Sequence, residues 1–320
     1  MSAQPVPNGA PDTAHRPPNA QTAVPAAATP AVAPPVAADP AAPSPGRELA
    51  AVLAAASPGA SEVALDLPLT LTTTFPFFAA RPRYTVRHLL GARDLDGDEQ
   101  AWYVSEPIRS DTPAQSGVSY ASSPESAFEP RLESAGLTEV RVAVPLPDGL
   151  TGHPDLFGAY VDRRVVVRLC TAENEVLLHG SADEAVTGLL NVRGRRTARG
   201  RGGLAADVAW AAALVEETGG SCDGMVVHPD VYWRLTLDGR LTHLNAVGVR
   251  VSRTRMIDRH QALFGDFRAV ATLLDPARSR LVLRRGGDGA PDVVEAYCQV
   301  GLAVHLPQHL VLADLGEALR

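Results

Sequence analysis

The segment from Asp155 to Gly180 constrains the fold more strongly than any other part of this sequence. Pro154 before it and Gly180 at its end fit the start and the stop of a helix. Residues at three- and four-residue spacing form two neighbouring helical stripes: Leu156, Tyr160, Arg164 and Val167, then Phe157, Val161, Val165 and Leu169. The pattern predicts one helix over residues 155–180, roughly 24 residues and about 36 Å long. We call this helix the spine, because other elements are expected to pack across it.

The polar side of the spine carries no catalytic pattern. Arg163, Arg168 and Glu173 supply this side, and we interpret Glu173 and Glu175 as solvated carboxylates. The sequence therefore predicts a structural role for the spine.

Composition excludes several kinds of chemistry. The formal net charge is −7, so bulk electrostatics gives no case for nucleic-acid binding. No lysine occurs, so all 29 residues counted as lysine plus arginine are arginine. The chain can therefore form no lysine Schiff base, P-loop lysine contact or lysine–asparagine cross-link.

Cysteine usage and hydropathy indicate a cytoplasmic protein. Cys170, Cys222 and Cys298 lie far apart in apolar surroundings, and we expect buried, reduced thiols. We expect no secretory signal, because no basic region followed by an apolar run stands near the first residues. The sequence contains no apolar run of about 18 residues, so it predicts no membrane-spanning helix.

Residues 1–60 differ in composition from the rest of the chain. They hold 13 of the 27 prolines and no aromatic residue. Such a segment buries too little apolar surface to offset its ordering entropy, so we expect a disordered Pro/Ala-rich arm over residues 1–60. A short helix over Arg47–Ala56 is the one exception that the pattern favours.

Two neighbouring segments predict contacts with another surface. From Leu65 the chain is threonine-rich and extended, and its prolines confine it to a sheet edge or an arm. Trp102–Ser105 predicts a strand, and Phe128–Pro145 predicts a strand pair after a polar excursion. A two-stranded ribbon is marginally stable alone, so this one requires a partner surface.

Five arginines follow the spine within a glycine-containing run, which leaves two interpretations open. They are Arg193, Arg195, Arg196, Arg199 and Arg201. Anion or nucleic-acid contact is one interpretation, but no aromatic residue is interleaved and the whole chain is acidic. A flexible loop whose arginines pair with acidic neighbours is the other, and we favour it.

The remaining sequence predicts mixed helices and strands. Helices are expected over residues 204–218 and 229–237, and short strands over 225–228 and 249–252. Alternation over residues 294–306 predicts a strand with one well-buried face, and residues 281–283 are its expected antiparallel partner.

We find no pattern for catalysis, a cofactor or a metal. Ser221 lacks the last glycine of a nucleophile elbow, and nothing brings Cys222 and His228 together as a dyad. The nine histidines show no metal-ligand spacing. Residues 94–99 resemble a calcium loop, but their glycine comes too early, so we expect a tight turn.

Five motifs in order resemble encapsulin shell proteins and the major capsid proteins of tailed phages, over about residues 65–315. They are Thr72–Thr74, Trp102–Pro145, Asn174–Gly180 with Thr187–Leu190, Phe264–Phe267 with Arg284–Gly287, and Val300–Leu312. The resemblance implies an α+β fold of the Hong Kong 97 phage capsid type. Its expected parts are an arm (61–97), an extended loop (98–147), a peripheral domain with the spine (155–180), an axial domain (192–262) and peripheral strands (263–320).

The resemblance also implies function. It implies a bacterial shell subunit that self-assembles into a hollow icosahedral compartment enclosing a cargo enzyme, with no catalysis of its own. A prophage or virion capsid that packages nucleic acid is the alternative, and an enzyme with an unrecognised site is a distant one. The assembly contacts expected by analogy are Thr72, Thr73, Thr74, Trp102, Tyr103, Phe128 and Glu129. No insert fits the cyclic-nucleotide-binding domain of one encapsulin subgroup, and we expect no cofactor and no membrane partner.

Overall fold

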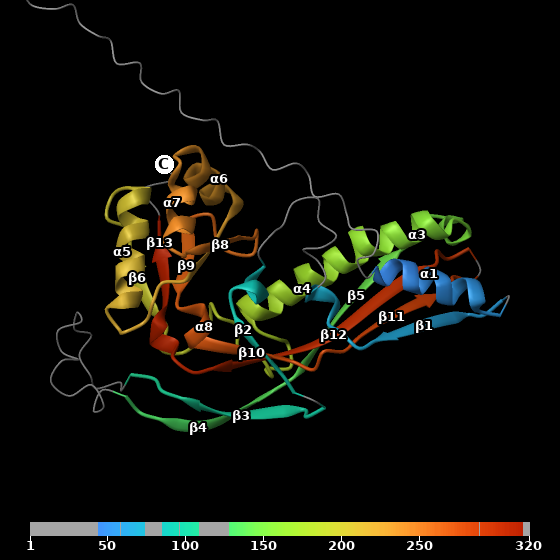
Figure 1. Cartoon of the computed structure of the whole chain (residues 1–320), viewed down its shortest axis with the longest axis horizontal. Coiled ribbons are helices and arrows are strands. Elements are labelled where there is room, and N and C mark those ends of the chain that lie inside the picture. Colours follow the sequence, from blue (N-terminus) through green and yellow to red (C-terminus); the bar gives the residue numbers. More distant parts are fainter. Residues whose placement is uncertain are drawn as a thin grey trace, which may run out of the picture. The chain divides into compact units, whose positions relative to one another are not determined.

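The computed structural model describes residues 44–57, 59–73, 85–95, 97–108, 128–287 and 289–315. All of them belong to one compact unit. Its described elements form two sheets, a separate two-stranded ribbon, and helices that pack against the sheets (Figure 1). No helix among these residues is long and apolar enough to cross a membrane.

The larger sheet is organised around the long strand β12. The strand order is β1-β11-β12-β10-β2, and β5 pairs with β12 as well. The strands are β1 Glu62–Leu67, β2 Gly91–Asp94, β5 Thr138–Pro145, β10 Ala271–Asp275, β11 Ser279–Arg284 and β12 Val293–Val304. The antiparallel pair predicted from alternation is confirmed, because Leu281 of β11 lies opposite Ala296 of β12. Strand β1 is an edge strand, as its flanking prolines predict.

Strands β10 and β11 run along β12 one after the other, with a break between them. Leu274 lies opposite Gly301, and Ser279 lies opposite Cys298. The intervening residues therefore bulge out of the ladder, and Ala277 there takes a positive φ of 51°. Asp275, at the start of this bulge, is buried.

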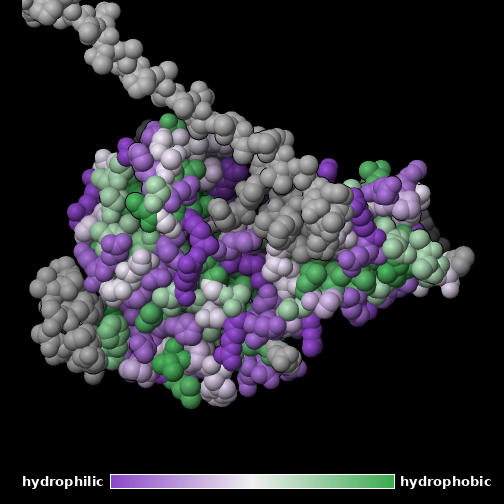
Figure 2. All heavy atoms as spheres, in the orientation of Figure 1, coloured by the Kyte–Doolittle hydropathy of each residue, from purple (hydrophilic) through white to green (hydrophobic). Residues whose placement is uncertain are grey.

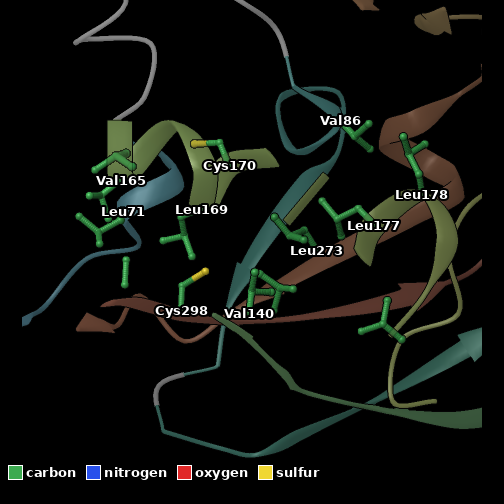
Figure 3. Packing of buried hydrophobic residues seen from close by; sticks show 14 of the residues in the cluster. Leu71, Val86, Val140, Val165, Leu169, Cys170, Leu177, Leu178, Leu273 and Cys298 are labelled. Carbon is green, nitrogen blue, oxygen red and sulfur yellow. The ribbon is translucent and has the colours of Figure 1, made fainter. Parts of the chain in front are cut away.

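The spine is a continuous helical path with one widened turn. It comprises α3 Pro154–Tyr160, a π-helical turn Val161–Val165 and α4 Val166–His179. The predicted stripe of Phe157, Val161, Val165 and Leu169 is fully buried. Figure 3 shows Leu169 of the spine pointing towards Val140 and Cys298 of the sheet across the apolar core.

Helix α1 (Pro45–Ala55) packs against α3. The short helix predicted over Arg47–Ala56, as an exception within the Pro/Ala-rich arm, is confirmed with an earlier start at Pro45. Ser44 caps the helix by accepting from the backbone N–H of Arg47 at 3.1 Å. Residues 1–43 lie outside the described residues.

The smaller sheet has the strand order β6-β13-β9-β7-β8. Its strands are β6 Arg196–Arg199, β7 Gly224–Val227, β8 Arg250–Arg253, β9 Gln261–Gly265 and β13 Leu310–Asp314, and its helices are α5 Leu204–Glu216, α6 Pro229–Leu237 and α7 Arg240–Ala246. A second apolar cluster, which includes Met225 and Phe264, joins them. The domain boundary predicted at residue 262 is wrong, because it cuts through β9 and excludes β13.

Short elements complete the described chain. They are η1 Val86–His88, η4 Leu150–Gly152, α8 Phe267–Val270 and η6 Pro307–His309. Residues 71–73 also form a helical turn. The ribbon strands are β3 Gln100–Ser105 and β4 Arg131–Gly136, and residues 109–127 between them lie outside the described residues.

Candidate assembly surfaces

The outer face of the β3–β4 ribbon exposes large apolar side chains. Trp102 lies opposite Ser134, and Val104 lies opposite Leu132. Because side chains alternate between the faces of a strand, Trp102, Val104 and Leu132 share one face. Their exposed fractions are 61%, 48% and 70%. These three residues form the surface that we call the ribbon patch, and Figure 2 shows a small group of hydrophobic spheres among hydrophilic ones at the lower rim of the view.

The inner face of the ribbon packs against its own subunit. Ala101 and Ala135 are buried beside Leu274 and Ala303 of the larger sheet. Tyr103 shares this face, and its hydroxyl donates to Glu133 at 2.9 Å. Burial and the Glu133 carboxylate raise the pKa of Tyr103 to about 12. Tyr103 is expected from the family resemblance to be an assembly contact, but the structure places it on the face opposite Trp102.

His305, which follows β12, holds Val104 near the end of β3. One ring nitrogen, Nδ1, lies 3.0 Å from the carbonyl oxygen of Val104, and Nε2 lies 3.0 Å from Oγ1 of Thr272. The ring of Tyr103 meets the His305 ring edge to face, with 5.4 Å between centroids. The ribbon is therefore held along its inner face, while the ribbon patch has no covering element among the described residues.

The far end of the ribbon holds two further predicted contacts. Phe128 is half-buried and forms an isolated β-bridge with Ile108. Glu129 is exposed, and its carboxylate lies 2.9 Å from the guanidinium of Arg131. Both residues therefore remain at the surface.

The threonine-rich segment that begins at Leu65 is described as far as residue 73, and it is held largely inside the subunit. Thr72 is buried, and its hydroxyl donates to Oε1 of Glu173 at 2.9 Å. Its prediction as an inter-subunit contact is therefore wrong, because its side chain is engaged by the spine. Thr73 is exposed and donates to the carbonyl oxygen of Thr70. Thr74 lies outside the described residues.

A buried ionic network connects this threonine-rich segment to the spine. The guanidinium of Arg87 reaches Glu173 at 2.6 Å through Nη2 and Asp275 at 2.7 Å through Nη1. Thr70 donates to Asp275 from the other side. Burial opposes the charge on Arg87, but the two carboxylates outweigh it and raise the pKa of the guanidinium. Glu173 is thus a buried ion-pair partner and not the solvated residue that we expected.

The solvent-facing side of the larger sheet carries a network of ion pairs. Arg284 lies 2.8 Å from Glu62 and 3.0 Å from Glu295, and Arg141 lies 2.5 Å from Glu295. The hydroxyl of Tyr297 also donates to Glu295. This hydrogen bond and the two arginines lower the pKa of Glu295 to about 2. A hollow of roughly 660 Å³ lies over this face.

Part of the arginine run is held by contacts with the rest of the subunit. Residues 196–199 form the edge strand β6, so the prediction of a flexible loop is wrong there. Arg196 donates to the carbonyl oxygen of Leu214 and pairs with Glu217 at 3.5 Å, as the acidic-neighbour interpretation predicts.

The other arginines of the run differ in their surroundings. Arg201 stacks on Trp210, with 3.3 Å from the guanidinium carbon to the ring centroid. Nε and Nη1 of Arg195 are buried without a partner among the described residues, and burial lowers the pKa of this side chain. Arg193 and Arg199 are exposed.

The groups considered for catalysis occupy structural positions. Cys170, Cys222 and Cys298 are free and buried, and burial raises the thiol pKa of each, in the case of Cys222 to about 12. The ring of His228 caps α6 by accepting from the N–H of Asp230 at 3.2 Å. No group of three or more His, Cys, Asp or Glu residues could hold a metal ion within the described ranges.

Comparison with known proteins identifies the fold. No family model matches the chain, and no curated protein matches it. Among solved structures, a virus-like particle protein from Pyrococcus furiosus aligns with a TM-score of 0.52 and 12% identity, covering 77% of this chain and 97% of that chain. The capsid of a native GTA particle aligns with a TM-score of 0.51 and 14% identity, covering 73% and 97%. Microbacterium phage Oxtober96 gives a TM-score of 0.50 and 14% identity, covering 70% and 88%. The predicted α+β fold of the Hong Kong 97 phage capsid type is thus confirmed.

Proposed function

We propose that copies of this chain associate into a hollow icosahedral shell that encloses a cargo protein, and that the chain itself performs no catalysis. Such a particle is an encapsulin-type compartment, and its expected place is the cytoplasm. The observation that carries the proposal is the ribbon patch, which leaves Trp102 and Leu132 more than half exposed. Burial of each such side chain contributes about 1.5–3 kcal/mol, so a neighbouring copy that covers the patch gains stability.

The fold supports assembly as the role of this patch. The solved structures with this fold include a virus-like particle and a particle capsid. In a closed symmetric assembly every copy presents the same surfaces to its neighbours, so one exposed patch per chain is covered in all copies at once. The ribbon patch therefore suits a contact that repeats around a shell.

Charge favours a protein cargo over packaged nucleic acid. The chain has a formal net charge of −7, which repels a polyanion. Within the arginine run, Arg196 is engaged by Glu217 of the same subunit. Fewer of these arginines are left for phosphates than the sequence alone indicates.

Purification of the full chain expressed alone tests the proposal. We expect size-exclusion chromatography with light scattering to give a megadalton mass, and negative-stain microscopy to show hollow particles of uniform size. Absorbance at 260 nm after nuclease treatment separates the two kinds of shell. Nuclease-resistant nucleic acid inside the particles would replace the compartment proposal with the capsid alternative. A monomer or dimer at physiological salt would overturn both.

A further inference from the structure

A cavity of roughly 570 Å³ lies between the spine and the smaller sheet. Val167, Cys170 and Asn174 of α4 line it on the spine side. Trp233 of α6 and the segment Arg253–Met256, which begins at the end of β8, line the other side. Binding cavities for small molecules typically enclose about 300–1,000 Å³, so this one is of suitable size.

The cavity is positively charged. Arg253 and Arg255 line it, and no carboxylate is among its described lining residues. Arg253 is stacked on Tyr232 at 4.4 Å and near Trp233 at 5.4 Å from the ring centroids. These ring contacts position a guanidinium but do not neutralise its charge. An anion in the cavity would therefore meet two arginines without competition from an acidic lining residue.

The acidic group beside the cavity is already engaged. Asp230 follows Pro229, which lines the cavity, but Asp230 itself does not line it. Its carboxylate lies 3.6 Å from Nε of Arg259. The positive charge of Arg253 and Arg255 is therefore not offset by this carboxylate.

The spine side of the cavity suits an apolar body with one polar contact. Val167 and Cys170 present apolar surface, and Met256 adds a flexible thioether. Trp233 is 51% exposed, which leaves part of its ring available for stacking. Oδ1 of Asn174 accepts from the N–H of Val86 at 3.0 Å, so the side-chain amide N–H groups of Asn174 remain as donors.

We infer that this cavity binds a small organic anion, with a carboxylate, phosphate or sulfonate group at the two arginines and an aromatic or apolar body against Trp233 and the spine. Such a ligand would connect two regions that otherwise have separate apolar clusters. Cys170 belongs to the cluster around the spine, and Tyr232 packs against the cluster of the smaller sheet. The inference is independent of whether the chain forms a shell.

Two related fluorescent probes test the inference with the full chain. The anion 8-anilinonaphthalene-1-sulfonate has an aromatic body and a sulfonate, and N-phenyl-1-naphthylamine has the same rings without the charge. We expect the anion to bind once per chain, and its affinity to fall about tenfold or more in Arg253→Gln/Arg255→Gln. Binding of the neutral probe should change by about twofold or less, because it does not use the charges.

Matched variants distinguish the cavity from other probe-binding surfaces. Arg164→Gln removes an exposed arginine of the spine that does not line the cavity, and it should leave the affinity for the anion unchanged. Trp102→Gln/Leu132→Gln removes the ribbon patch and should also leave this site intact. Arg255 is exposed, so Arg255→Gln alone tests the charge without risk to folding.

Each outcome supports or overturns the site. Selective weakening of anion binding in the cavity variants, with binding of the neutral probe unaffected, supports it. Equal affinity for the anion in wild type and in Arg253→Gln/Arg255→Gln overturns the inference. Arg164→Gln would overturn it too, if that variant weakened anion binding as much as the cavity variants do.

Discussion

Arg87 and Glu173 form an ion pair inside the subunit in which Nε of Arg87 lies 3.0 Å from both carboxylate oxygens and Nη2 lies 2.6 Å from Oε1. Thr72 donates to the same carboxylate. Thr72 precedes residues 74–84 in the sequence, and Arg87 follows them. One glutamate of the spine therefore fixes the chain on both sides of that stretch.

Breaking this pair should destabilise the subunit strongly. Arg87→Met leaves Glu173 and Asp275 buried without their cation, and we expect the free energy of unfolding to fall by about 3–5 kcal/mol. Urea unfolding at a fixed chain concentration measures the loss, because assembly makes stability depend on concentration. Arg280→Met is the matched control: its partner Asp66 is exposed, and the pair contributes about 1 kcal/mol or less. Equal losses in the two variants would contradict a structural role for the buried pair.

Helix α1 depends on a close glycine contact with the spine. A Cβ on Gly46 would lie 2.1 Å from the carbonyl oxygen of Gly158. The N–H of Gly46 also donates to Asp162 at 2.8 Å, within the π-helical turn. We therefore expect Gly46→Ala to lower the free energy of unfolding by about 1–3 kcal/mol, although alanine normally favours a helix.

Hydrogen exchange localises the effect of this change. The amides of α1 should exchange faster in Gly46→Ala than in wild type, while those of the smaller sheet should not. Gly152→Ala serves as the control, since a Cβ there has no atom within 4 Å. Unchanged exchange over Pro45–Ala55 would show that the helix tolerates the added methyl group in place.

Removal of the ribbon patch should prevent assembly without unfolding the subunit. In Trp102→Gln/Leu132→Gln, two apolar side chains per contact lose about 1.5–3 kcal/mol each, so association at that contact weakens roughly 100-fold or more. Light scattering should show subunits in place of particles, with an unchanged far-ultraviolet circular dichroism spectrum. Leu156→Gln replaces a side chain that is 60% exposed on α3 and should still assemble. Particles in all three proteins would exclude the ribbon patch as an assembly contact.

The network of ion pairs around Glu295 on the larger sheet predicts that stability depends on pH. The pKa of Glu295 is lowered from 4.5 to about 2, chiefly by the hydrogen bond from Tyr297 and then by Arg141 and Arg284. Stability from this carboxylate is therefore fully present above pH 4.5 and is lost as the pH falls from there through about 2. Glu295→Gln should have a lower Tm than wild type at pH 7, and the difference should shrink over that window.

A neighbouring glutamate provides the comparison for this pH profile. Glu139 of β5 is exposed, and within the described part of the chain its carboxylate forms no ion pair with Arg141 or Arg284. Glu139→Gln should therefore change the Tm at pH 7 less than Glu295→Gln does. A difference for Glu295→Gln that stays constant down to pH 2 would contradict the assigned stabilisation.

Periodic segments are the part of the fold that can be predicted well from the sequence. The spine stripe that begins at Phe157 and the alternation of β12 follow directly from burial on one face. Strands β9 and β10 escape prediction, because short apolar runs do not distinguish a strand from a helix. The arginines of β6 favour a loop, and only its parallel pairing with β13, which places Arg196 opposite Val311, makes it a strand.

The candidate contacts show the same limit at the level of single residues. Trp102 and Tyr103 are predicted together, yet neighbours in a strand face opposite sides, so this alternation could have separated them. Nothing local marks Glu173 as buried, since its partner Arg87 comes from η1 and is shared with Asp275 at the bulge after β10. A charged residue is expected to be solvated unless the fold that pairs it is known.

The position of β13 between β6 and β9 has a consequence for biosynthesis. Residues 310–314 are translated after every other strand of the smaller sheet, and β12 similarly enters between β11 and β5 of the larger one. Neither sheet can form completely before these residues leave the ribosome, so each sheet is completed by the last of its strands to be translated.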